Sequence, residues 1–258
     1  MYTLVARDLE LSINIEAGTI SSLRLAGKEC IVSLCPIFVA RLRNKAGECF
    51  YIDSTKAECH EARSGCITYS GFGGDFSSLW VKIIVEANEE INWEIELGGV
   101  DSEYALEWVE LPKICLPKLK DNDPKGGKIL FPYNEGIIVT NENELPRYEP
   151  EFLSSGAYFT FPNMVSSQFM SYLFDSVGLY IGAHDKKRGL KCVDFYPYEN
   201  GVALQMRLYS GADYGQGYKS EFPIVFKSCG PSWQSAGEIY RGWFESNPPQ
   251  NLTKISKN

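Results

Sequence analysis

Strict alternation of apolar and polar residues is the feature of this sequence that most limits its fold. Residues 9–16 (LELSINIE) place an apolar side chain at every second position, and residues 91–97 (INWEIEL) repeat the pattern. Residues 202–209 (VALQMRLY) alternate again. A period of two is typical of a strand with one buried face. Long segments of this kind, with almost no helical periodicity between them, predict an all-β fold of packed antiparallel sheets.

Further strands are expected where β-branched and aromatic residues gather between turn signals. They cover residues 20–25, 31–43, 49–52, 66–69, 79–87, 104–111, 131–140 and 222–228. Pro112 should end the strand before it, because proline has no N–H to donate to a sheet. Residues 168–174, 177–183 and 190–193 follow one another across short turns. They predict a three-stranded meander at the centre of a sheet.

The period changes only near the carboxyl end of the sequence. Apolar residues recur there at helical spacing, at Ala236, Ile239, Tyr240, Trp243 and Phe244. This spacing predicts one helix over residues 235–245, whose aromatic face packs on the sheets. Ser235, with Glu238 three residues later, matches a capping box at the start of that helix.

Composition and charge exclude several classes of partner. The net charge of −8 argues against nucleic acid and against an anionic membrane surface. The sequence has no apolar run of about 18 residues, so we expect no membrane-spanning helix. Its first residues (MYTLVARDLELSI) lack the apolar stretch of a signal peptide. We therefore expect a cytoplasmic protein.

The cysteines do not form a metal-binding pattern. The sequence has 8 cysteines and 2 histidines, and no CxxC pair occurs. A zinc site built from spaced ligand pairs is therefore not expected. Free cysteine is among the most often buried residues, and disulfide frameworks belong to small secreted chains. We expect free thiols, and neither a metal nor a cofactor.

Several motifs together resemble one known family. Residues 158–191 contain Q-F-M-x-Y, then G-L-Y followed by His184-Asp185, then Lys191 after a short turn. Residues 131–136 (FPYNEG), residues 236–243 (AGEIYRGW) and the opening hairpin over residues 9–29 fit the same family. In this order they resemble the N-terminal domain of a family of bacterial glycoside hydrolase-like proteins.

That resemblance implies the fold and the domain plan. The family's N-terminal domain is a large antiparallel β-supersandwich, similar to galactose mutarotase, and a (β/α)8 catalytic barrel follows it. The resemblance therefore implies a supersandwich over residues 1–230, a closing helix of the same domain over 231–247, and a linker or tail over 248–258. No βαβ alternation occurs in this sequence, so the barrel would lie outside it.

Two short segments are candidates for a carbohydrate site. His184-Asp185 lies at a predicted strand end, where the pair could orient a sugar hydroxyl or transfer a proton. Alternatively, Asp185 caps its own turn and His184 packs at a sheet edge. Glu135 beside Tyr133 could bind hydroxyls while the aromatic ring stacks on the sugar; alternatively, Glu135 is an exposed loop acid. Further tyrosines could be sugar platforms, namely Tyr196, Tyr198, Tyr214 and Tyr218.

Three functions remain open at this point. The resemblance favours a non-catalytic accessory domain that packs on a (β/α)8 barrel and contributes to carbohydrate binding. The alternatives are a stand-alone aldose epimerase (mutarotase)-like enzyme that uses His184 and Glu135, or an independent carbohydrate-binding module. The segment around His60 does not resemble the histidine motif of true mutarotases. Glycoside hydrolysis needs two placed carboxyl groups. In the family that this chain resembles the barrel supplies them, so we expect no hydrolysis by this chain alone.

Overall fold

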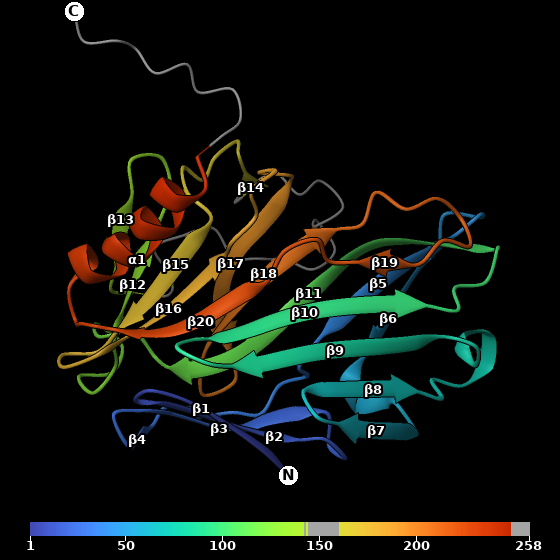
Figure 1. Ribbon diagram of the computed structural model, residues 1–258, viewed down its shortest axis with the longest axis horizontal. Coiled ribbons are helices and arrows are strands. Elements are labelled where there is room, and N and C mark those ends of the chain that lie inside the picture. The colour runs from blue at the N-terminus through green and yellow to red at the C-terminus, as the bar shows by residue number, and fades with distance from the viewer. Residues whose placement is uncertain (142, 144–159, 249–258) are drawn as a thin grey trace, which may run out of the picture.

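The computed structural model describes residues 1–141, 143 and 160–248 of the protein. These residues form three antiparallel sheets and, at the carboxyl end, one α-helix (Figure 1). The predicted fold class, an all-β supersandwich with one C-terminal helix, is therefore confirmed. The expected tail beyond residue 248 and the first residues of the 158–191 segment lie outside the described part of the chain.

The opening sheet consists of β1 (Tyr2–Ala6), β2 (Leu9–Asn14), β3 (Thr19–Leu25) and β4 (Lys28–Glu29), in that order. It lies along the lower edge of the other two sheets in Figure 1. On β2, Leu9, Leu11 and Ile13 are fully buried, while the residues between them are only half-buried. The alternation in the sequence therefore identified the buried face of this strand.

The large sheet carries the long central strands of the fold. Its main order is β13 (Ile137–Val139), β12 (Lys128–Phe131), β15 (Phe169–Leu173), β16 (Gly178–Ala183), β20 (Ile224–Cys229), β10 (Ile91–Gly98), β9 (Trp80–Ala87), β8 (Cys66–Ser70) and β7 (Cys59–Arg63). The short strand β19 (Tyr218–Lys219) also pairs with β10. The helix α1 (Trp233–Ser246) packs against β15 and β16 on the face that points away from the core.

The six-stranded sheet lies behind the large sheet in Figure 1. Its order is β14 (Thr160–Phe161), β17 (Lys191–Tyr198), β18 (Gly201–Tyr209), β11 (Tyr104–Pro117), β5 (Val39–Asn44) and β6 (Cys49–Asp53). The 3₁₀ turn Ser54–Lys56 connects β6 of the six-stranded sheet to β7 of the large sheet. The 3₁₀ turn Gly74–Phe76 connects β8 to β9 within the large sheet. One apolar cluster joins buried side chains from all three sheets. The three sheets therefore share a single core.

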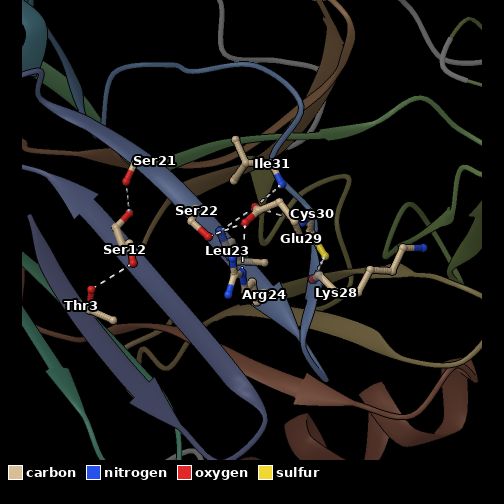
Figure 2. Close-up of polar contacts among 10 residues, drawn as sticks. All are labelled: Thr3, Ser12, Ser21, Ser22, Leu23, Arg24, Lys28, Glu29, Cys30 and Ile31. Atoms are coloured by element: carbon tan, nitrogen blue, oxygen red, sulfur yellow. Dashed lines mark hydrogen bonds and ion pairs between the residues drawn. The ribbon is translucent and has the colours of Figure 1, made fainter.

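Glu29 fixes the turn that leads from the opening sheet toward the six-stranded sheet (Figure 2). Its Oε1 accepts backbone hydrogen bonds from Leu23 at 3.1 Å, from Cys30 at 3.1 Å and from Ile31 at 3.0 Å. Its Oε2 accepts one from the Ser22 hydroxyl. Burial by itself raises the pKa of Glu29, but these hydrogen bonds outweigh it and lower the pKa. The Glu29 side chain thereby satisfies one amide of β3 and the two amides that follow β4.

The predicted meander is wrong in its third strand. The strands β15 and β16 pair as expected, but β17 belongs to the six-stranded sheet, and β16 pairs with β20 instead. Between β16 and β17 the chain passes from one sheet to the other. Both sheets offer an apolar face to the same core, so an apolar strand after a short turn fits either one. Local sequence therefore cannot select its partner.

Two predicted boundaries also differ from the structure. The strand β11 continues through Pro112, because its pairing with β18 shifts register between Glu110 and Lys113. Such an irregularity accommodates a residue without an N–H inside a strand. The helix begins earlier than predicted, because the Ser232 hydroxyl accepts the hydrogen bond from the amide of Ser235. The Ser235 hydroxyl is bonded to the Gly230 carbonyl at 2.9 Å, so Ser235 is not the cap.

The cysteines agree with the prediction from their spacing. All of them, Cys30, Cys35, Cys49, Cys59, Cys66, Cys115, Cys192 and Cys229, are free thiols. Burial raises the pKa of most of these thiols, for example that of Cys30 to about 11, so the buried ones are poor nucleophiles. Within the described residues, no helix has both the length and the apolar character that a membrane span requires.

Candidate functional site

The six-stranded sheet has one apolar face and one polar face. On β18, every second side chain from Val202 to Leu208 belongs to the core. Successive side chains of a strand point to opposite faces, so Gln205 and Arg207 lie on the other side of the sheet. We call this side the polar face. It comprises Arg41, Arg43, Tyr51, Glu107, Trp108, Glu110, Lys113, Asp194, Tyr196, Tyr198, Gln205, Arg207 and Tyr209.

Charged side chains on the polar face are buried, which is unusual for a sheet surface. Arg207 is 0% exposed and Glu110 is 4% exposed. Arg207 Nη2 donates to Glu110 Oε1 at 2.5 Å, and Lys113 Nζ lies 3.8 Å from Glu110 Oε2. The Arg207 guanidinium also stacks over the Trp108 ring, 4.1 Å from its centroid. These contacts hold Trp108 and the two charges in one fixed arrangement.

Asp194 lies beside this group on β17, opposite Gln205 of β18. Burial and the charge of Glu110 raise the pKa of Asp194 well above its usual range. Glu110, in contrast, is paired with two cations. The two carboxyl groups therefore lie in different electrostatic environments on one face of the sheet.

A pocket of about 310 Å³ opens at the end of the polar face. Its charged and aromatic lining consists of Arg41, Arg43, Glu107, Trp108 and Tyr209. Arg41 Nε lies 2.8 Å from Glu107 Oε2, and Arg43 forms an ion pair with Glu107 Oε1. Ligand pockets in proteins have volumes of roughly 300–1,000 Å³, so this one suits a small ligand or one unit of a larger ligand.

Tyr51 does not line the pocket itself, but its ring contacts two of the residues that do. The Tyr51 ring lies 6.0 Å from the Trp108 ring, and the Arg41 guanidinium lies 5.9 Å from the Tyr51 centroid. Tyr51 is 41% exposed, so its ring is open to a ligand. The described residues contain no cluster of histidine, cysteine, aspartate and glutamate that could hold a metal ion. The groups that this face offers to a ligand are hydrogen-bond donors, cations and aromatic rings.

The residues predicted from sequence lie away from the polar face. Tyr133 and Glu135 belong to the connection between β12 and β13, at an edge of the large sheet. Tyr133 is half-buried against the core, and its backbone bridges to Val165. Glu135 is exposed, and it has no hydrogen bond or ion pair with the part of the chain that the structure describes. Carbohydrate binding by these two residues stays a prediction.

Asp185 forms the turn that the sequence allowed as an alternative. It is buried, and its carboxylate accepts from the amides of Lys187 at 2.8 Å and Gly189 at 2.7 Å. Asp185 Oδ2 also accepts from Lys191 Nζ at 2.9 Å, and Lys191 Nζ donates to Gln168 Oε1 at 2.7 Å. The family motif residues Gln168, Asp185 and Lys191 therefore form one buried polar cluster, which ties β15 to the turn before β17.

His184 has different partners from Asp185. Its ring stacks on Trp243 of α1 with centroids 4.9 Å apart, and its Nε2 lies 3.1 Å from the Tyr180 hydroxyl. Burial and the charge of Lys227 lower the pKa of His184 to about 4. His184 and Asp185 therefore do not form a His–Asp hydrogen bond. The histidine instead joins the helix to the large sheet, which is the packing role that the sequence left open.

The stacking of His184 on the helix can be tested by titration. Because the ring is half-buried and neutral, its NMR signals should stay unchanged from pH 7.5 to 5.5 and move only toward pH 4. His60 is the other histidine; its side chain is exposed, so its signals serve as the reference. Trp243→Ala should uncover the ring and raise the pKa of His184 toward about 6.5. Titration of His184 near pH 6.5 in the unmodified protein would contradict the stack.

The sequence did not predict the polar face, because the pattern of a single strand does not show whether its polar side is buried. The alternation over residues 202–209 places Gln205 and Arg207 on the same side of a strand. The polar side of such a strand is normally expected to face solvent. Burial of that side depends on neighbouring strands, and Glu110, the partner of Arg207, is 97 residues away in sequence. Two polar-face residues, Tyr196 and Tyr198, were named from the sequence as possible sugar platforms.

Comparison with known proteins identifies the fold. No family model matches the sequence, and no curated protein matches it either. Among solved structures, the chain is similar to the alpha-N-acetylgalactosaminidase NagBb from Bifidobacterium bifidum in its Gal-NHAc-DNJ complex. The TM-score is 0.68 at 12% identity, over 96% of this chain and 39% of that one.

A second similar structure is the GH36 alpha-galactosidase AgaA A355E D548N from Geobacillus stearothermophilus, in complex with raffinose. The TM-score is 0.53 at 9% identity, over 95% of this chain and 43% of that one. The chain thus spans about two fifths of the length of these enzymes. At such low identity the likeness shows the fold alone. The fold is an antiparallel β-supersandwich that both of these enzymes share with this chain over most of its length, as the sequence motifs implied.

Proposed function

We propose that this chain is a non-catalytic accessory domain of a glycoside hydrolase-like protein, and that its polar face binds carbohydrate. The observation that carries the proposal is the pocket beside Trp108 and Tyr51, which combines aromatic rings with charged hydrogen-bonding groups. A sugar ring has an apolar face that stacks on aromatic side chains and hydroxyls that need polar partners. The structural neighbours are a hexosaminidase and a galactosidase, which supports a role in carbohydrate chemistry.

The ion pairs of two polar-face carboxylates support the accessory role. A glycosidase needs two carboxyl groups on opposite sides of the scissile bond. Glu107 is held by two arginines, and Glu110 by Arg207 and Lys113, so both carboxylates are committed to ion pairs. We therefore propose that the supersandwich over residues 1–230, with its closing helix over 231–247, supports a barrel that provides the catalytic groups.

The second candidate function is an aldose epimerase-like enzyme. The observation that favours it is the pair of carboxyl groups on the polar face, where burial and the charge of Glu110 raise the pKa of Asp194. An epimerase of this type needs an acid to protonate the ring oxygen and a base to accept the proton of the anomeric hydroxyl. Polarimetry of freshly dissolved sugars distinguishes the two functions, because an accessory domain should leave the rate of mutarotation unchanged.

Saccharide binding should depend on Tyr51. In calorimetric titrations with a panel of neutral and acidic mono- and oligosaccharides, Tyr51→Ala should weaken binding about 10-fold, because about 1.4 kcal/mol of ring stacking is lost. Trp233→Ala is the control, since Trp233 is an exposed aromatic residue of α1, outside the polar face. Glu135→Gln tests the site predicted from the β12–β13 connection.

The outcomes separate the possible locations of the site. Loss of binding in Tyr51→Ala but not in Trp233→Ala supports the polar face. Loss in Glu135→Gln alone would move the site to the β12–β13 connection. Absence of binding to every saccharide at millimolar concentration would contradict a carbohydrate-binding role for this domain.

A further inference from the structure

The pocket on the polar face has more cationic groups than it can neutralise. Arg41 and Arg43 share a single carboxylate, because Glu107 Oε2 pairs with Arg41 and Glu107 Oε1 pairs with Arg43. Two guanidinium charges against one carboxylate charge leave one positive charge in excess. This excess lies in a protein whose net charge is −8. The local sign is therefore opposite to that of the whole molecule.

A second pair of cations lies farther along the polar face. There Arg207 and Lys113 both contact the carboxylate of Glu110. Burial and the charge of Glu110 raise the pKa of the Asp194 carboxyl, which disfavours a negative charge there. A cleft lined by one sign of charge concentrates ligands of the other sign.

Donors in the pocket also lack acceptors. The Arg41 side chain is 8% exposed, and its Nη2 donates to Cys49 Sγ at 2.9 Å. Its Nη1 is buried and has no hydrogen-bond partner among the described residues. Trp108 Nε1 is likewise buried without a partner, and an indole N–H can only donate. A buried donor left unsatisfied costs free energy. A ligand that brings acceptor oxygens would satisfy these groups.

We propose that this pocket binds the anionic group, a carboxylate or a sulfate, of an acidic sugar. The inference rests on the proposed carbohydrate binding and specifies its ligand class. Guanidinium groups bind such oxyanions through paired N–H···O hydrogen bonds. Arg43 is half exposed and supplies the accessible charge, Arg41 supplies the buried donor, and Tyr51 supplies a ring for the sugar. A neutral sugar would leave the excess positive charge of the pocket uncompensated.

Matched pairs of ligands test the proposal. Calorimetry compares methyl glucuronide with methyl glucoside, and galactose 6-sulfate with galactose, while sodium acetate and sodium sulfate serve as free-anion probes. The acidic member of at least one pair should bind 10-fold or more tightly than its neutral partner, and the difference should shrink as salt concentration rises. The pair that shows the difference identifies carboxylate or sulfate as the preferred group.

Three variants make the test specific to this pocket. Arg43→Gln should weaken binding of the acidic sugar about 10-fold and leave a neutral sugar unchanged. Glu107→Gln should strengthen binding of the acidic sugar several-fold, because it removes the carboxylate that competes for both arginines. A residue with a merely structural role would not produce such a gain. Arg63→Gln removes an exposed arginine of β7, outside the polar face, and should have no effect.

The outcomes distinguish failure of this inference from failure of the proposed function. Equal affinity for acidic and neutral sugars, or weaker binding in Glu107→Gln, would overturn the anionic ligand while carbohydrate binding stands. Binding of acetate or sulfate as tight as that of the acidic sugars would show a free-anion site and would overturn the sugar. If no saccharide binds at all, both proposals fall. Thermal unfolding of each variant confirms that its fold is intact.

Discussion

Asp185→Asn is expected to lower the free energy of unfolding by about 3–5 kcal/mol, because it leaves a buried ammonium without its counter-ion. The side chain of Lys191 is 0% exposed and that of Asp185 is 4% exposed. After the substitution, Lys191 Nζ keeps only neutral acceptors, which are Gln168 Oε1 and the Gly189 carbonyl. Chemical denaturation monitored by circular dichroism measures the loss.

An exposed ion pair provides the control for this result. Asp175→Asn removes an aspartate whose carboxylate lies 2.6 Å from Lys120 Nζ, at a side-chain exposure of 77%. Exposed pairs contribute little, so this variant should unfold almost as the unmodified protein does. Lys191→Met should be destabilising as well, since it leaves the Asp185 carboxylate buried without its cation. A change no larger in Asp185→Asn than in Asp175→Asn would show that the buried pair is not needed.

The loss of unfolding free energy in Asp185→Asn should become smaller at acidic pH. Burial by itself raises the pKa of Asp185, but the hydrogen bonds from Lys191, Gly189 and Lys187 outweigh it and lower the pKa. A lowered pKa means that the stability from this group is fully present above about pH 4. It is lost as the pH falls through the folded-state pKa. The difference between the two proteins should therefore be constant from pH 5 to 8 and should shrink below about pH 4.

Trp93→Ala is expected to cost about 3–5 kcal/mol, because it opens a large cavity between the sheets. Trp93 is 0% exposed on the inner face of β10, and it packs edge to face on Phe226 with centroids 5.8 Å apart. Its cross-strand neighbours are Val85 of β9 and Ile224 of β20. Thermal and chemical unfolding measure the effect, which should appear as a large fall in the unfolding midpoint.

Two further variants separate burial of the ring from loss of a tryptophan. Trp93→Phe keeps most of the buried ring and removes an indole N–H that has no hydrogen-bond partner, so it should cost much less. Trp233→Ala removes a tryptophan that is 56% exposed at the start of α1, and it should change stability by no more than about 0.5 kcal/mol. Equal losses in Trp93→Ala and Trp233→Ala would be incompatible with the packing of β10 in the core.

The sequence was informative where one residue's environment follows from its neighbours along the chain. Alternation predicted the buried side of β10 with Trp93, and helical spacing predicted α1 within two residues at its start. These patterns work because a strand places successive side chains on opposite faces and a helix repeats every 3.6 residues. The sequence also allowed the turn at Asp185, because an aspartate side chain often accepts a hydrogen bond from the backbone amide two residues later.

The tertiary structure alone decided which strands pair and which polar residues are buried. The strand β17 joined the six-stranded sheet, although an apolar strand fits either sheet. Gln168 contacts Lys191, and Glu110 contacts Arg207, only because the folded chain brings distant segments together. A polar residue in an alternating strand looks solvent-facing, and its burial depends on strands far away in the chain. For this reason the sequence determined the all-β supersandwich and its helix, whereas the polar face, with its excess of positive charge, emerged only from the assembled sheets.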